Sequence, residues 1–250
     1  EPQVIRHGKF KSAVEPFMLN EMSDENRKQI EIYMGSLWNT YTQNIALNRG
    51  VSSNRLNEII NNFELKTPKD AVKLGLIDSL FYDDQFRKHL VYLSHEDTYE
   101  DIKFINLSRY DNVKSENARE KFKKDKITII YAQGEIVSGT GSETVIGSER
   151  ISKAIRNARE DEKVKAIVLR VNSPGGSALA SDVIWREMVL AKDTKPVVVS
   201  MGDVAASGGY YIACASDKIY ASPNTITGSI GVFGLLWSFE ELFSEKLGLT

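Results

Sequence analysis

The sequence predicts an α/β fold built around a largely parallel sheet. The β-branched run Val164–Val171 and the shorter run at 196–199 are typical of strands buried on both faces. Each run is followed by a glycine-bearing turn and then by a helical pattern, so strands and helices alternate at short intervals. This alternation indicates parallel strands joined by helical crossovers.

Composition limits the function classes. The 250 residues are 42% hydrophobic and 26% charged, as in ordinary globular proteins, and their number suits one large domain or two smaller ones. The 32 basic and 34 acidic residues leave a net charge of −2, which favours neither nucleic acid nor anionic membrane as a partner. No apolar run reaches the roughly 18 residues that a transmembrane helix needs.

The single cysteine, Cys214, excludes an internal disulfide framework and a multi-cysteine metal site. We interpret it as a small buried hydrophobe. The sequence does not begin with Met and starts inside a stretch with the pattern of a strand, so we expect it to be a piece of a longer chain.

The first part of the chain is predicted to be mostly helical after a short strand at Val4 and Ile5. Ser23 is a good N-cap for a long helix that ends at Gly50. Apolar residues along it recur at spacings of three and four, and we interpret this stripe as core or domain packing. Its members are Ile30, Tyr33, Met34, Leu37, Trp38, Tyr41 and Ile45.

Shorter elements follow, and then a polar stretch that marks a domain boundary. Helices are predicted over 53–63, from Thr67-Pro68 to Gly75 and over 83–93, with strands over 76–80 and 102–107. We interpret the charged run at 115–126 as a solvated linker or helix.

The second part carries the alternation of strands and helices. Strands are predicted at 127–130, 164–171, 197–200, 218–221 and 226–232, and helices from a Ser148 cap, over 177–192 and over 210–215. A Gly/Ser/Thr tract at 138–142 is typical of a mobile loop.

Two glycine-bearing turns, at 172–177 and 205–209, end consecutive buried strands. Ligands of parallel α/β sheets bind at the carboxyl ends of the strands, so both turns are expected to face one crevice. Their backbone N–H groups would then stabilise a negative charge beside Ser207, the serine at the strand–helix junction. Neither turn follows a phosphate-binding glycine pattern or the Gly-x-Ser-x-Gly nucleophile elbow. The alternative is a tight turn with no chemistry.

A nucleophilic serine needs a base. The histidines are His7, His89 and His95, and none lies in the predicted domain of Ser207, so a triad would require His7 to reach across. The other candidate is a neutral lysine. With an unperturbed pKa of about 10.4, about one lysine in 2,500 is neutral at pH 7, a cost of about 4.6 kcal/mol that burial must largely remove. Spacing alone does not choose among the lysines.

Four segments in order closely resemble the bacterial signal peptide peptidase A family, in its long type with two related domains in tandem. They are FKSAVEPF at 10–17, VLRVNSPGGS at 168–177, MGDVAASGGY at 201–210 and TGSIGVFG at 227–234. The resemblance runs over essentially the whole chain. It implies two Clp/crotonase-like α/β domains, the first lacking its N-terminal part and the second its C-terminal part.

The resemblance also implies site residues. Ser207 matches the nucleophile and Lys11 the general base, whereas Lys9 falls outside the matching motif. Gly208 and Gly176 would form the oxyanion hole, and Ser229 would orient the lysine amine. No metal or organic cofactor is implied.

By the same resemblance, residues 1–93 belong to the first domain, 94–125 to a linker and 126–250 to the second domain. The expected function is a serine endopeptidase that degrades cleaved signal peptides at the bacterial inner membrane, on the periplasmic side. Membrane attachment would come through a segment absent here. Self-association into a homo-oligomeric ring, as a tetramer, is expected, and nucleic-acid binding is not.

Two alternatives remain open. A crotonase-type acyl-CoA enzyme would share the fold and the oxyanion hole but use a carboxylate base, and a serine-directed probe on Ser207 distinguishes it. A catalytically inactive peptide-binding scaffold would show no pH-dependent hydrolysis.

Overall fold

The computed structural model describes residues 2–111, 125–239 and 242–248 and divides the chain into two compact units. The sheet unit comprises Glu1–Thr40 and Lys123–Thr250, and the helical unit comprises Tyr41–Phe122. Most of the charged run at 115–126 lies outside the described residues. The assignment of 1–93 and 126–250 to two tandem domains stays a prediction.

The sheet unit is organised around a parallel sheet, which confirms the predicted α/β class. Strand order is β2-β6-β7-β8, and β9 pairs with the far end of β7. Because β7 is longer than predicted, its first half pairs with β8 and its last residues pair with β9. The bounds are β2 (Lys126–Gln133), β6 (Val164–Ser173), β7 (Val197–Ala206), β8 (Lys218–Tyr220) and β9 (Ile226–Gly228).

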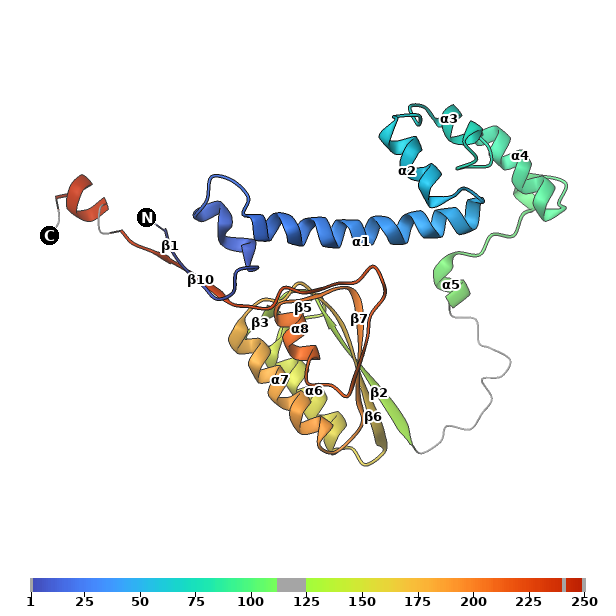
Figure 1. Cartoon of the computed structure of the whole chain (residues 1–250). Helices are drawn as coiled ribbons and strands as arrows, with labels where there is room; N and C mark the ends of the chain where they lie inside the picture. Colours follow the sequence, from blue (N-terminus) through green and yellow to red (C-terminus); the bar gives the residue numbers. More distant parts are fainter. Residues whose placement is uncertain (1, 112–124, 240–241, 249–250) are drawn as a thin grey trace. The chain divides into compact units, whose positions relative to one another are not determined.

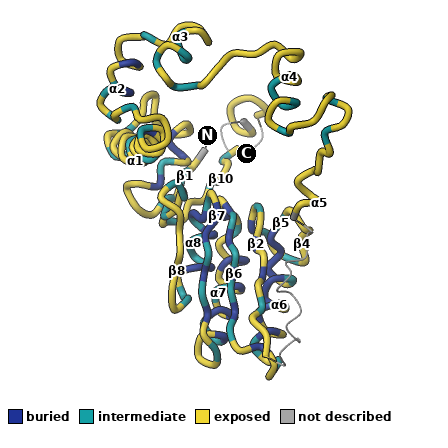
Figure 2. The backbone as a smooth tube through the Cα atoms, turned by 90° about the vertical axis from the view of Figure 1, so that its right-hand side faces the viewer, coloured by how far each residue is buried: buried dark blue, intermediate teal, exposed yellow. Residues whose placement is uncertain are grey.

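Helices α6 (Ser148–Glu160), α7 (Ala178–Lys192) and α8 (Gly208–Ala213) cover one face of this sheet (Figure 1). Alternate residues of β6, including Ile167 and Leu169, are fully buried in the core beneath them. Figure 2 shows the buried positions concentrated along these strands and helices. Ser148 is the first residue of α6 and Gly147 its N-cap, so the predicted Ser148 cap is wrong by one position.

A small second sheet, in the order β3-β5-β4, lies beside the start of α7. Ile136 of β3 forms a parallel bridge with Gly176, which ties this sheet to the turn after β6. The bounds are β3 (Ile136–Val137), β4 (Gly141–Ser142) and β5 (Val145–Gly147).

An antiparallel pair joins the two ends of the chain. β1 (Pro2–Arg6) pairs with β10 (Phe233–Trp237), with Arg6 opposite Phe233 (Figure 1). The 3-10 helix η1 (Ser12–Phe17) follows β1. Since β10 comes soon after β9, the pairing holds the segment between β1 and η1 close to the end of the parallel sheet. A five-residue π-helix, Leu242–Lys246, follows β10.

Helix α1 (Asp24–Arg49) begins after Ser23, whose hydroxyl accepts a hydrogen bond from the Asn26 N–H at 3.1 Å. This confirms the predicted N-cap. The apolar stripe of α1 is not buried as predicted, because among the residues described for this helix only Thr42 is buried. Trp38 remains 38% exposed and Tyr41 54%.

The helical unit contains the end of α1 and several short helices, of which α2 and α3 have side-chain N-caps. Ser52 caps α2, and Thr67 and Asp70 form a capping box around α3. The strands predicted at 76–80 and 102–107 are wrong: the first forms bends after Gly75 and the second an irregular connection, and neither has a paired strand among the described residues. The bounds are α2 (Ser53–Asn61), α3 (Pro68–Lys73), α4 (Asp83–Ser94), η2 (Tyr99–Asp101) and α5 (Leu107–Asp111).

Neighbouring residues of α7 provide a test of the core. We expect Ile184→Ala, at a fully buried position, to lower the free energy of unfolding by about 2–5 kcal/mol through lost burial and a cavity. Val183→Ala, one position along and 43% exposed, should change it by only about 0.5 kcal/mol. Urea denaturation followed by circular dichroism measures both, and equal losses would contradict this arrangement of α7.

Candidate active site

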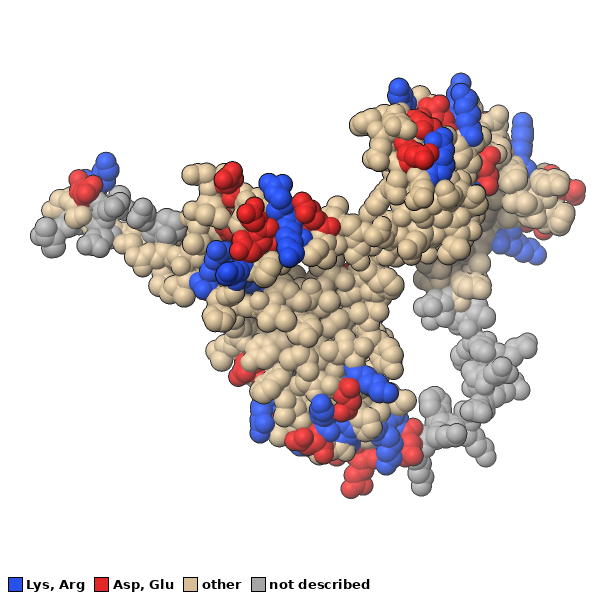
Figure 3. All heavy atoms as spheres, viewed as in Figure 1, with Lys and Arg blue, Asp and Glu red and all other residues tan. Residues whose placement is uncertain are grey.

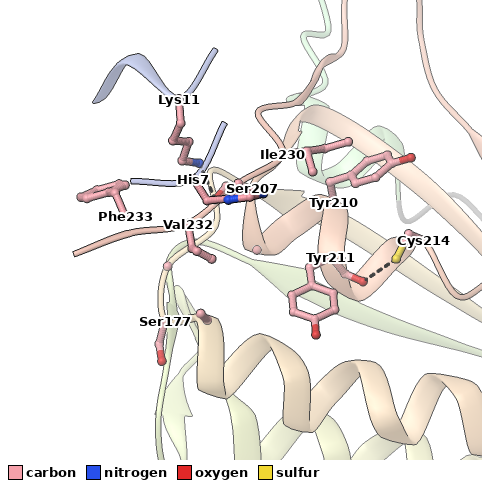
Figure 4. Close-up of a pocket in the computed structure, with 14 residues that line it drawn as sticks. His7, Lys11, Ser177, Ser207, Tyr210, Tyr211, Cys214, Ile230, Val232 and Phe233 are labelled. Atoms are coloured by element: carbon pink, nitrogen blue, oxygen red, sulfur yellow. Dashed lines mark hydrogen bonds between the residues drawn. The ribbon is translucent and has the colours of Figure 1, made fainter. Parts of the chain in front are cut away.

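The segment between β1 and η1 brings Lys11 to Ser207. The Lys11 Nζ lies 3.0 Å from the Ser207 Oγ, although the two residues are 196 positions apart in the sequence (Figure 4). Both belong to the sheet unit. The structure thus brings together the two residues on which the sequence interpretation depends.

Ser207 stands at the junction of β7 and α8 in a strained backbone conformation. Its φ of +53° and ψ of −120° are unusual for a non-glycine residue and are held by a hydrogen bond from its N–H to the Gly228 carbonyl at 2.9 Å. Such strain persists where the surroundings dictate it, and it is concentrated at functional sites. Here it presents the hydroxyl at the carboxyl end of the sheet.

Lys11 is 5% exposed, which is unusual for a lysine. Its amine also contacts the Ser229 carbonyl at 2.9 Å and the Ser229 hydroxyl at 3.2 Å. Burial lowers the pKa of Lys11 below the ordinary value of 10.5, because the charged ammonium loses water. Both Ser229 oxygens therefore lie within hydrogen-bond distance of the amine, and the lysine-orienting role that the resemblance implies for Ser229 stays a prediction.

Gly231 allows the two chain segments to approach. A Cβ there would lie 2.8 Å from the His7 carbonyl and 3.6 Å from the Lys11 side chain, and its φ is +140°. A larger residue would therefore push the lysine segment away from the site.

The predicted oxyanion glycines lie on two turns in close contact. A Cβ on Gly175 would fall 2.7 Å from the Gly208 nitrogen and 2.9 Å from the Ser207 Cβ, so the two turns touch only because Gly175 has no side chain. Gly208 begins α8, so its N–H has no acceptor within that helix. The two residues next to Gly176 hydrogen-bond Ile136: the Ile136 N–H donates to the Gly175 carbonyl, and the Ser177 N–H donates to the Ile136 carbonyl. In such a parallel bridge the N–H of Gly176 itself points to the opposite side of the chain.

A cavity of about 590 Å³ opens beside Ser207. Its wall is mostly apolar, and no carboxylate lines it among the described residues, so no negative charge there favours the charged form of Lys11. Figure 4 shows the aromatic and aliphatic side chains around it. Its lining consists of His7, Lys11, Gly176, Ser177, Ala178, Ser207, Gly208, Tyr210, Tyr211, Cys214, Ile230, Gly231, Val232 and Phe233.

Sequence reasoning was wrong about Cys214 and missed most of the apolar wall. Cys214 is exposed and lines the cavity, and its thiol donates to the Tyr211 carbonyl at 3.2 Å. The signal available was helical spacing: Tyr210, Tyr211 and Cys214 follow Ser207 at three, four and seven positions, on one side of a helix. The cavity residues at 230–233, which lie before and at the start of β10, had no such signal.

His7 also lines the cavity, but its backbone N–H donates to the Val232 carbonyl at 3.1 Å as part of the strand pairing. The structure shows no hydrogen bond between its ring and Ser207. Lys9 is exposed, in agreement with its place outside the motif. No group of three or more potential metal-ligating side chains occurs among the described residues.

Comparison with known proteins identifies the family. The family model described as Peptidase family S49 matches residues 1–94 and 190–250. The chain belongs to peptidase family S49. This confirms the resemblance drawn from the four motifs, and the parallel sheet agrees with the Clp/crotonase-like fold that the resemblance implies.

Three relatives extend over nearly the whole chain. Protease 4 of Haemophilus influenzae is 36% identical, over 99% of this chain and 42% of the relative. Serine protease SPPA, chloroplastic, of Arabidopsis thaliana is 36% identical, over 100% and 37%, and Protease 4 of Salmonella typhi is 38% identical, over 97% and 40%. The chain spans about two fifths of the length of these relatives.

Competitive acetylation tests the environment of Lys11. We expect the Lys11 amine to react with acetic anhydride with a midpoint below pH 10.5, because burial disfavours its charged form. Mass spectrometry of the Lys11 peptide across pH, with free N-acetyl-lysine as internal standard, gives the midpoint. A midpoint at or above that of the standard would contradict the burial of the amine.

Proposed function

We propose that this protein is a serine endopeptidase in which Ser207 is the nucleophile and Lys11 the general base. The observation that carries the proposal is the 3.0 Å contact between a buried amine and the hydroxyl of a strained serine. Nucleophile–base pairs of this kind work within hydrogen-bond reach. Membership of peptidase family S49 supports the reaction class.

The geometry supports the following steps. The neutral Lys11 amine accepts the Ser207 proton while Oγ attacks the scissile carbonyl, and the N–H groups of Gly208 and Gly176 stabilise the oxyanion that forms. The resulting ammonium then donates its proton to the leaving amine. A water molecule, activated by the same amine, hydrolyses the acyl-enzyme. The two Ser229 oxygens hold the amine in place through both half-reactions.

The protonation state of the Lys11 amine determines how the activity depends on pH. A charged Lys11 has no lone pair for the Ser207 proton, so activity falls as pH drops through the pKa of Lys11. Because burial lowers that pKa, activity extends to lower pH than an exposed lysine would allow.

The cavity supports a peptide substrate with an apolar residue beside the scissile bond. Cleaved signal peptides, the substrates implied by the resemblance to signal peptide peptidase A, are rich in such residues. An acyl-CoA enzyme of the same fold would need a carboxylate base, and none lines the cavity among the described residues. The mixed charges on the face shown in Figure 3 offer no single-sign patch for nucleic acid.

We further propose that the protein acts at the bacterial inner membrane, on its periplasmic side, as a homo-oligomeric ring, a tetramer. Both proposals rest on the resemblance to the family. None of the helices in the described part of the chain is long and apolar enough to cross a membrane.

Alanine substitutions test the pair of residues. In the full-length protein, Ser207→Ala and Lys11→Ala should each lower kcat for a peptide substrate by at least about 10³-fold, because the nucleophile and its base act as a unit. Circular dichroism should remain that of the folded protein. The His7→Ala variant should keep a kcat far above that of either of these variants, since the His7 ring lines the cavity without bonding Ser207.

Hydrolysis by purified Ser207→Ala at the wild-type rate would overturn the proposal. An active Lys11→Ala together with an inactive His7→Ala would replace the lysine with a Ser–His pair.

Cys214→Phe tests the cavity as the site of the residue before the scissile bond. The added ring should occupy the part of the cavity next to position 214 and lower kcat/KM about 10- to 100-fold for peptides with leucine at that position, with little effect on those with alanine. Cys214→Ser, similar in volume, is the control. Equal losses on both peptides would place the substrate side chain elsewhere.

A further inference from the structure

Glu15 is a buried carboxylate that the reaction itself does not use. It lies on η1, four residues after Lys11, and is only 4% exposed. A carboxylate is rarely buried to this extent without partners that compensate its lost hydration. Glu15 does not line the cavity beside Ser207.

The partners of Glu15 come from both sides of the lysine segment. Its carboxylate accepts hydrogen bonds from the Ser23 hydroxyl at 2.5 Å, the Ser23 N–H at 3.4 Å and the Asn26 side chain at 2.9 Å, all at the start of α1. Arg6 Nη1, on β1, lies 3.9 Å away and has no other partner among the described residues. These donors hold the pKa of Glu15 below the usual range, so it stays ionised.

Lys11 lies between the two elements that Glu15 connects. Arg6 ends β1 and Glu15 is on η1, and the backbone between them is tied by the His7 N–H, which donates to the Val232 carbonyl at 3.1 Å, and by little else before Lys11. The Lys11 N–H meets the Gly8 carbonyl only at 3.4 Å, and residues 7–10 are exposed. The direction of the lysine side chain therefore depends on how firmly β1, η1 and α1 are held together.

We propose that Glu15 is a positioning residue for the Ser207–Lys11 site, and that its hydrogen bonds to Ser23 and Asn26 and its ion pair with Arg6 keep the Lys11 amine between Ser207 and Ser229. The inference rests on the proposed function. Glu15 does not touch the reacting atoms but acts through the segment that carries the base. A displacement of about 1 Å at a reacting group can lower a rate about 100-fold.

The test compares Glu15→Gln with Glu187→Gln in the full-length protein. Glu187 is a matched control, because it is 7% exposed, bonds Arg156 at 3.0 Å and lies in the same unit, but joins α6 to α7. Three measurements are made on each variant: kcat and KM for a peptide, the midpoint of Lys11 acetylation, and the melting temperature.

For Glu15→Gln we expect kcat to fall about 10- to 100-fold with KM within about twofold, since the cavity is unchanged. The acetylation midpoint should rise towards that of free lysine, because a misplaced amine gains water. The other titratable groups of the cavity, His7, Tyr210, Tyr211 and Cys214, are unaltered, as are the charged groups Arg6 and Lys9 nearby in sequence. Glu187→Gln should lower the melting temperature but change neither kcat nor the midpoint of Lys11 acetylation.

A lowered melting temperature with unchanged kcat and midpoint would make Glu15 merely structural and overturn the inference. Should Glu15→Gln fail to fold, Asn26→Ala removes one hydrogen bond to Glu15, keeps the Ser23 cap of α1, and is expected to give smaller changes of the same kind. The acetylation midpoint tests the inference independently of catalysis. If Lys11→Ala remains active, the proposed function is refuted, but the midpoint measured on Glu15→Gln still shows whether Glu15 positions the Lys11 amine.

Discussion

A lysine amine withdrawn from water and hydrogen-bonded to a serine is the interaction on which the rest of the site depends. Each part of the structure around it serves either to remove water from the amine or to hold it against Ser207. Burial to 5% exposure lowers the pKa of Lys11, and Ser229 contributes two oxygens as partners. The pairing of β1 with β10 is what makes this burial possible, because it brings a residue near one end of the sequence beside the turn after β9.

The close approach of the Lys11 segment and the turn after β6 to the Ser207 turn would cause steric clashes, and residues without side chains avoid them. Gly175 lets the turn after β6 contact the turn that carries Ser207, and Gly231 lets the lysine segment pass. Ser207 and Ser229 themselves have positive φ angles of 53° and 49°, a conformation that disfavours side chains. Stability from the fully buried core of β6, α6 and α7 maintains these strained positions. The glycine-rich turns are therefore a geometric requirement of the site, beyond any role of their N–H groups.

Much of the sheet unit could be predicted because its signals are local. Buried β-branched runs, Gly and Pro punctuation and helix caps located β2, β6 and α7 to within three residues, and they located the start of β7 but not its last six residues. Lys11 was identified only through a motif resemblance, since nothing local distinguishes it from other lysines. Cys214 was misjudged because it lies on the wall of a cavity that several separate segments of the chain form together, and local sequence does not reveal such a wall. The strands predicted at 76–80 and 102–107 had suitable residues, but a strand requires a partner that local composition does not supply.

A neutral base and a buried carboxylate on adjacent segments raise an electrostatic conflict. An uncompensated negative charge near Lys11 would favour the ammonium and weaken the base. In this structure burial is the cause of the lowered pKa of Lys11, and the charge of Glu15 is compensated by Ser23, Asn26 and Arg6, which hold η1 against α1 and β1. An apolar residue at position 15 would avoid the conflict but would lose the directional bonds that fix the segment. The Glu15 carboxylate thus holds in place the segment that carries Lys11, whose own side chain has four flexible carbons. The negative charge of Glu15 is compensated by groups other than the lysine.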